Sequence, residues 1–157
     1  IAVALLNHFK KASAVVTDIS EKAMGYAVYN LNRYGLIGRA KALISNGFSG
    51  LGTEACWDLI VSNPPYLSYG DWQQVEPELK YEPHEAFDGG PDGVLFYRQI
   101  LESAGNHLKP KGWLVMEIGK GQAAIVKQLI QERDFDPTSC YRDYLGIERV
   151  IVAKKHG

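Results

Sequence analysis

The sequence lacks the features that mark several classes of protein. Only two of its 157 residues are cysteines, Cys56 and Cys140, and they form no Cys-x-x-Cys pair. This favours reduced thiols in a cytosolic protein over a disulfide framework. The four histidines show no metal-ligand spacing, so no metal site is expected.

Positive charge is not in excess either. Lys and Arg number 17 against 18 Asp and Glu, which gives a net charge of −1. A protein that binds nucleic acid by coating phosphates needs the opposite balance, so direct nucleic-acid binding is not expected. No apolar run approaches membrane-spanning length, which argues against a membrane partner. With 46% hydrophobic and 22% charged residues, the chain reads as one globular, cytoplasmic domain.

An initiator Met is missing as well. The chain opens inside the apolar run Ile1–Leu6, as if within a helix. This predicts a fragment of a longer protein.

Helix and strand patterns alternate along the chain. Near-continuous apolar strands between amphipathic helices predict a parallel sheet covered on both faces. Two final strands without a helix between them predict a terminal antiparallel hairpin. Residues 67–93 read as a long loop, which is usually functional in a compact domain. The predicted helices cover 1–9, about 21–34, 94–108 and about 121–133; the predicted strands cover 14–17, 39–45, 57–61, 113–118, 138–142 and 147–154. Ser20 is the expected N-cap of the second helix and Gly35 its stop, and a turn is expected at 109–112.

Three polar features follow predicted strands: Asp18, Asn46 and the run Asn63–Tyr66. In an open parallel sheet, ligands bind outside the carboxyl ends of the strands. A carboxylate at the position of Asp18 could accept hydrogen bonds from both hydroxyls of a ribose. It could equally be an ordinary carboxylate at a helix entry.

The run Asn63–Tyr66, Asn-Pro-Pro-Tyr, is the most specific signal. Two consecutive prolines fix two φ angles and remove two N–H donors, so nearby carbonyls become rigid acceptors. With the Asn63 side-chain oxygen they can hold both N–H bonds of an NH₂ group. Tyr66 can stack on a planar substrate or face a sulfonium methyl group. Methyl transfer to an amide or amino nitrogen needs such anchoring, because a planar nitrogen is a poor nucleophile. The alternative is a turn that merely ends the strand.

With its flanking residues, the segment Asp58–Tyr66 resembles the catalytic-loop motif of the HemK/PrmC methyltransferases, which methylate the N5 of a glutamine in peptide chain release factors. Further stretches across the chain match the same family: Tyr81–Pro83, Ala86, Asp88–Gly93, Phe96–Arg98, Glu117–Gly119, Arg142–Tyr144 and Glu148–Val150. The resemblance implies a Rossmann-like class I fold with a mostly parallel seven-stranded sheet. It also implies S-adenosyl-L-methionine as methyl donor and the glutamine of a Gly-Gly-Gln motif as acceptor.

The resemblance also implies roles for single residues. Asn63, Pro64, Pro65 and Tyr66 would be catalytic, and the substrate would contact Asn63, Pro64 and Tyr66 together with Glu82 and Pro83. The donor site would contain Asp18 on the ribose, Asn46 with Phe48 near the adenine, and Asn63. Asn46 departs from the family, which commonly has an Asp there.

A larger departure concerns what precedes Ile1. The family's first strand, its glycine-rich loop and its N-terminal helical domain have no counterpart within residues 1–157, so the sequence predicts a partial catalytic domain that binds donor weakly or not at all on its own.

Three alternatives remain. The same loop could serve an amino-methyltransferase of nucleic-acid bases, although the acidic residues after it would repel phosphates. The glutamine could belong to a ribosomal protein. The chain could also be a non-catalytic module.

Overall fold

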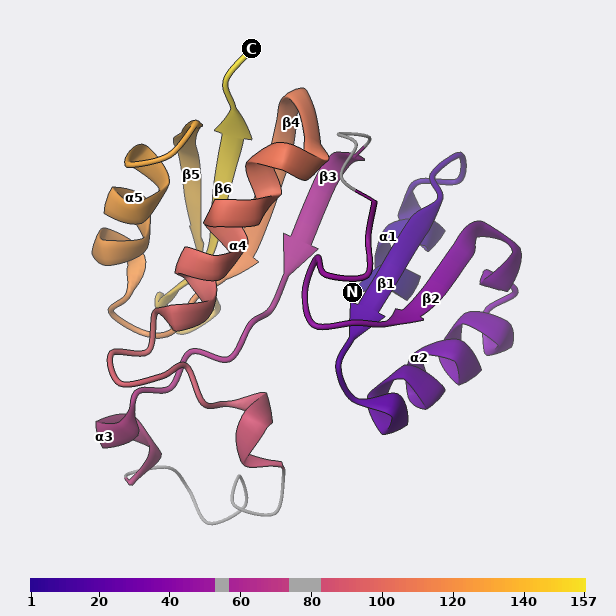
Figure 1. Cartoon of the computed structure of the whole chain (residues 1–157), viewed down its shortest axis with the longest axis horizontal. Helices are drawn as coiled ribbons and strands as arrows, with labels where there is room; N and C mark the ends of the chain where they lie inside the picture. Colours follow the sequence, from indigo (N-terminus) through magenta and orange to yellow (C-terminus); the bar gives the residue numbers. More distant parts are fainter. Residues whose placement is uncertain (53–56, 74–82) are drawn as a thin grey trace. The chain divides into compact units, whose positions relative to one another are not determined.

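The structure is a computed structural model that describes residues 1–52, 57–73 and 83–157. It contains two compact units, Ile1–Gly52 and Thr53–Gly157, each with a sheet of its own (Figure 1). Among the described residues, no helix combines the length and the apolar character needed to cross a membrane.

The first unit is built on two parallel strands, β1 (Ala14–Asp18) and β2 (Ala40–Ile44). Helix α1 (Ala2–His8) contacts β1, and α2 (Glu21–Arg33) contacts both strands. A short 3₁₀ helix, η1 (Ile37–Arg39), leads into β2. The buried core of this unit is formed by leucines from α1, α2 and the turn after α2: Leu6, Leu31 and Leu36.

Local signals set the ends of these elements. Ser20 caps α2 by accepting a hydrogen bond from the N–H of Ala23 at 3.2 Å, and Gly35 follows the helix with φ +68°, as the sequence predicts. The guanidinium of Arg39 donates to four carbonyls at and after the end of α1, at 2.7–3.1 Å. Arg39 therefore satisfies carbonyls that the helix leaves unpaired.

The second unit is built on a four-stranded sheet in the order β3-β4-β6-β5. Its strands are β3 (Trp57–Ser62), β4 (Leu108–Glu117), β5 (Phe135–Arg142) and β6 (Glu148–Lys155). β3 and β4 are parallel, whereas β6 is antiparallel to both β4 and β5. The predicted terminal antiparallel hairpin is therefore confirmed.

Two helices cover this sheet. α4 (Leu95–His107) contacts β4, α5 (Ala123–Gln131) contacts β5 and β6, and the two helices contact each other (Figure 1). Their apolar faces bury the largest side chains of the unit against the strands: Tyr97, Leu101, Leu114, Met116, Ile118, Val126, Ile130, Phe135 and Ile151.

The structure differs from the sequence prediction in two places. The turn expected at 109–112 lies inside β4 as a bulge: Trp57 is opposite Leu108, but Leu59 is already opposite Trp113. The long loop expected at 67–93 is partly ordered in its described portion. It contains α3 (Tyr69–Trp72), a 3₁₀ helix η3 (His84–Ala86) and a bridge between Leu67 and Asp88.

Candidate active site

Asp18 lies exposed at the carboxyl end of β1. Its Oδ1 accepts a hydrogen bond from the N–H of Ser20 at 2.8 Å, and its main-chain carbonyl accepts one from Ser45 at 2.9 Å. No donor among the described residues contacts Oδ2. The helix-entry role therefore exists in the structure and leaves one carboxylate oxygen for a ligand hydroxyl.

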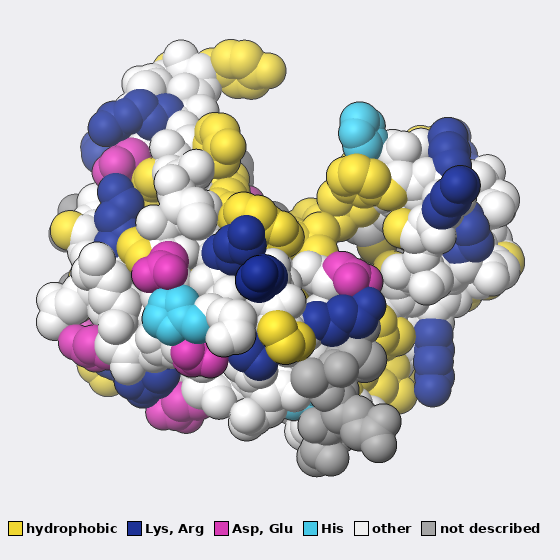
Figure 2. Space-filling model, turned by 90° about the horizontal axis from the view of Figure 1, so that it is seen from above, with side chains coloured by type: hydrophobic (Ala, Val, Ile, Leu, Met, Phe, Trp, Pro, Cys, Tyr) yellow, Lys and Arg dark blue, Asp and Glu magenta, His cyan; other side chains and the backbone are white. Residues whose placement is uncertain are grey.

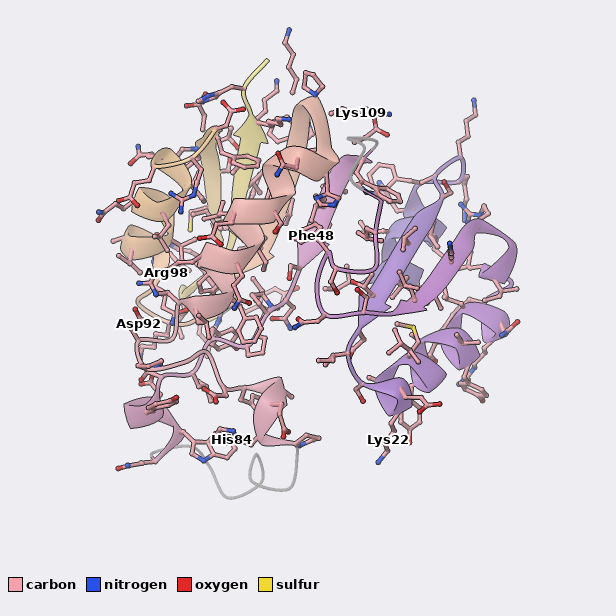
Figure 3. The ribbon with its side chains drawn as sticks, viewed as in Figure 1. Lys22, Phe48, His84, Asp92, Arg98 and Lys109 are labelled. Atoms are coloured by element: carbon pink, nitrogen blue, oxygen red, sulfur yellow. The ribbon has the colours of Figure 1, made fainter. Side chains whose placement is uncertain are left out.

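Asn46 follows the end of β2. Because Asp18 is opposite Ile44 in the parallel register, Asp18 and Asn46 lie at the same edge of this sheet. A turn after β2 exposes Asn46: its carbonyl accepts from Ser49 at 3.1 Å, and Gly47 has φ +54°. Half-buried Phe48 lies in the same turn (Figure 3). The first unit thus groups the three residues predicted for the ribose and adenine.

The segment Asn63–Tyr66 follows β3 in the second unit; we call it the acceptor loop. Asn63 is exposed, Pro64 is buried, and Pro65 and Tyr66 are half-buried. No donor among the described residues bonds the Asn63 side chain or the Pro64 carbonyl. The loop therefore presents two oxygens that still need hydrogen-bond donors.

A parallel bridge fixes the residue that follows this loop. The N–H of Leu67 donates to the carbonyl of Phe87 at 2.9 Å, and the Leu67 carbonyl accepts from Gly89 at 2.8 Å. The Asp88–Gly93 stretch, which the sequence singles out only by family resemblance, thus lies directly against the end of the acceptor loop.

Three glycines make this close approach possible. A Cβ added at Gly89 would lie 2.8 Å from the Tyr66 backbone, and one at Gly93 would lie 2.7 Å from the Tyr66 carbonyl oxygen. A Cβ at Gly119 would meet the ring of Tyr66 at 2.9 Å and the Gln122 amide at 2.6 Å. Any larger residue at these positions would displace Tyr66 or Gln122.

Gln122 connects the acceptor loop to its surroundings. Its Nε2 donates to the carbonyls of Tyr66 at 2.9 Å and Gly93 at 3.2 Å. Its Oε1 accepts from the N–H of Gly119 at 2.9 Å and lies 3.1 Å from the Tyr97 hydroxyl. Burial raises the pKa of the Tyr97 phenol well above its ordinary value, so this hydroxyl stays a neutral donor. Its single proton goes either to Gln122 or to the Glu117 carbonyl at 3.2 Å.

An ion pair braces the turn before α4. Asp92 Oδ2 lies 2.7 Å from an Arg98 guanidinium nitrogen, and Asp92 Oδ1 accepts from the N–H of Val94 at 3.2 Å (Figure 3). The hydrogen bond from Arg98 is the main cause that holds the pKa of Asp92 below its usual value. Asp92 therefore supports the turn that places Gly93 beside Tyr66.

A pocket of about 280 Å³ opens beside Tyr66. Its walls come from the acceptor loop and Leu67, from the turn Gly119–Gln122, and from the charged residues Asp71 and Arg149.

On the face drawn in Figure 2, basic, acidic and apolar side chains are interspersed. This mixed surface is in keeping with the near-zero net charge of the sequence.

The sequence predicts part of this site. Glu82 lies outside the described residues, whereas Pro83 lies exposed at the start of η3. Gln122 was missed. A signal was present in Gly119–Gly121, a glycine-flanked turn between a strand and a helix. Gly121 has φ +81°, and Gln122 N–H donates to the Gly119 carbonyl at 3.1 Å, so this turn presents Gln122 to the loop.

No family model matches the chain, but individual proteins do. It is 41% identical over 158 residues to the release factor glutamine methyltransferase of Fusobacterium nucleatum, covering 99% of this chain and 44% of that protein. It is 40% identical over 154 residues to the protein of the same name from Geobacter sulfurreducens, covering 96% and 52%. The resemblance to the HemK/PrmC family is confirmed. The chain spans about half the length of the curated relatives it matches.

Solved structures of other methyltransferases resemble this chain in fold. A methyltransferase from Pyrococcus furiosus aligns with a TM-score of 0.71 at 19% identity, covering 99% of this chain and 69% of that one. The ribosomal protein L11 methylase of Lactobacillus delbrueckii aligns at 0.67 and 18% identity, covering 99% and 65%. At such identities the likeness concerns the fold alone. It confirms the predicted Rossmann-like class I methyltransferase fold.

Proposed function

We propose that this chain carries the acceptor site of a methyltransferase that modifies the side-chain amide nitrogen of a protein glutamine, in the Gly-Gly-Gln motif of a peptide chain release factor. The observation that carries the proposal is the acceptor loop: no described residue bonds the Asn63 side chain or the Pro64 carbonyl, and Tyr66 is held in place. The release factor as substrate comes from the names of the relatives. Translation termination places such an enzyme in the cytoplasm.

The two unpaired oxygens suit a primary amide. An amide NH₂ has two N–H donors, and Asn63 Oδ1 and the Pro64 carbonyl can accept one each. The nitrogen becomes partly positive as its bond to the methyl carbon forms, so both hydrogen bonds strengthen in the transition state. The bond between the methyl carbon and the donor sulfur breaks with its electron pair left on sulfur, and the nitrogen then releases one N–H proton to water, so no strong base is needed before methyl transfer. Pro65 keeps the backbone between the Pro64 and Tyr66 carbonyls stiff.

The donor side of the proposal rests on the first unit. S-adenosyl-L-methionine supplies an electrophilic methyl group on a sulfonium. Asp18 fits the ribose of such a donor because its exposed carboxylate keeps one oxygen for a hydroxyl. Asn46 can bond an adenine edge with its amide, and Phe48 offers a flat apolar face beside it.

Methyl transfer from labelled S-adenosyl-L-methionine by the full-length protein tests this function. Release factor, ribosomal protein and nucleic acid are offered in parallel. We expect label on the Gly-Gly-Gln glutamine of the release factor, and none on a release factor in which that glutamine is replaced by Ala. Label on nucleic acid alone, or on no substrate, would overturn the proposal.

A further inference from the structure

Gln122 is the residue through which a distant segment reaches the acceptor loop. It lies 56 residues after Tyr66, at the N-cap of α5. Both hydrogens of its amide are used, one on the Tyr66 carbonyl and one on the Gly93 carbonyl. Its oxygen is bound by Gly119, with the Tyr97 hydroxyl beside it.

These contacts occupy two carbonyls next to the proposed amide site. The Tyr66 carbonyl is occupied by Gln122, and the Leu67 carbonyl is occupied by Gly89. The Pro64 and Pro65 carbonyls receive no hydrogen bond from the described residues. An amide at Asn63 and Pro64 then meets two fewer competing acceptors, because the Tyr66 and Leu67 carbonyls are occupied.

The contacts also restrain the direction of the Pro64 carbonyl. The proline ring locks the φ angle of Pro65, so few free torsions separate the carbonyls of Pro64 and Tyr66. Anchoring the Tyr66 carbonyl at one end therefore restrains the Pro64 carbonyl at the other. Gly89, Gly93 and Gly119 close the remaining space around Tyr66.

We propose that Gln122 is the positioning residue of the acceptor loop: it occupies the Tyr66 carbonyl and so aims the Asn63 and Pro64 oxygens at the substrate amide. This rests on the proposed function of the loop. Gln122 acts through Tyr66 and is not itself a catalytic residue.

Only a side chain with both an NH₂ group and an acceptor satisfies all of these partners. In Gln122→Glu, the oxygen facing Gly119 is retained, but a second oxygen replaces Nε2 and faces two carbonyls. In Gln122→Met, the length is retained and both hydrogen-bonding groups are lost. Gln128→Met is the matched control on the same helix, because exposed Gln128 bonds only Glu132 among the described residues.

The test compares these variants in the full-length protein, well below the melting temperature of each. It measures kcat and KM for release factor methylation, and donor affinity by calorimetry. Both Gln122 variants should lower kcat by about 10²-fold, the effect of misplacing a reacting group by about 1 Å. Donor affinity should stay within about twofold, and Gln128→Met should match the wild type in both.

Several outcomes would overturn the inference: an unchanged kcat in Gln122→Glu, or a loss of kcat that only follows a loss of donor binding. If Gln122→Glu does not fold, Gln122→Met gives the same decision. An inactive wild-type enzyme would contradict the proposed function, and the inference would fall with it. An active wild type with equally active Gln122 variants would contradict the inference alone.

Discussion

The residues at the ends of β1 and β3 are held in place by different kinds of contact. At the end of β1, the Asp18 side chain is held by Ser20, two residues away, and its main-chain carbonyl is held by Ser45, directly after the neighbouring strand β2. At the end of β3, Tyr66 and Leu67 are held by residues that follow 20 to 56 positions later, Phe87 and Gln122 among them. The Asp18 side chain is therefore set by a local contact, whereas Tyr66 and Leu67 depend on segments at least 20 positions away. The acceptor loop should therefore be the more sensitive of the two to remote substitutions.

Asn63→Ala should have the largest effect. The substitution removes one of the two proposed amide acceptors, so the substrate nitrogen loses half of its anchoring. We expect kcat to fall by about 10²- to 10³-fold, as for loss of a transition-state hydrogen bond. Donor affinity should hardly change, because Asn63 is only one of the predicted donor contacts and those to the ribose and adenine lie at the ends of β1 and β2. Steady-state kinetics and calorimetry on the full-length protein measure kcat and donor affinity.

Asn106→Ala, at an exposed position of α4, is the control. Retained turnover in Asn63→Ala would rule out the amide clamp.

Gly93→Ala tests the dependence on distant segments directly. Gly93 has φ +72° and Gly146 has φ +78°, so Ala is strained at both, by about 1–2 kcal/mol. A Cβ at Gly93 would also press on the Tyr66 carbonyl at 2.7 Å, whereas one at Gly146 meets nothing within 4 Å. Gly93→Ala should therefore lower the free energy of unfolding by about 1–3 kcal/mol more than Gly146→Ala does. Urea unfolding of the two variants measures the difference. Equal losses of unfolding free energy in the two variants would show that the close packing of Gly93 against Tyr66 does not contribute to stability.

These two strand ends also mark what could be predicted from the sequence. The strand patterns, the Ser20 cap and the Gly35 stop are local signals, and all are confirmed in the structure. The Asn63–Tyr66 run is recognisable because its chemistry is contained in four consecutive residues. Gln122 was not recognisable, because its partners are set by which segments the sheet brings together. The bulge in β4 was missed for the same reason: its register depends on pairing with β3.

Asp18→Asn examines the locally determined end. Asn keeps an oxygen for the N–H of Ser20, so the start of α2 should survive, while the negative charge offered to a ribose hydroxyl is lost. A hydrogen bond to a charged group contributes about 1.5–3 kcal/mol, so donor Kd should rise at least about tenfold. Calorimetry on the full-length protein measures this. Glu21→Gln, in the first turn of α2, removes a nearby charge as the control. If both variants bind donor like the wild type, Asp18 only serves the helix entry.

The smallest effect is expected for a substitution of His156, at the end of the second unit's sheet opposite the acceptor loop. Because β6 is antiparallel to β4, His156 lies opposite the end that bears the acceptor loop. Its ring nitrogens lie 2.9 Å from Asp134 and 3.2 Å from Asp136, and the hydrogen bond to Asp136 is the main cause that raises the pKa of His156 above 6.5. Because the pKa of His156 is raised in the folded state, the contact stabilises the protein fully below about pH 6.5, and this stabilisation is lost as pH rises through the folded pKa.

His156→Gln should lower the melting temperature slightly near pH 5.5 and leave it unchanged near pH 8.5. Thermal unfolding at both pH values measures this, and a difference that grows toward alkaline pH would contradict it. The turnover of His156→Gln should equal that of the wild type at either pH, because His156 lies at the end of the sheet opposite the acceptor loop.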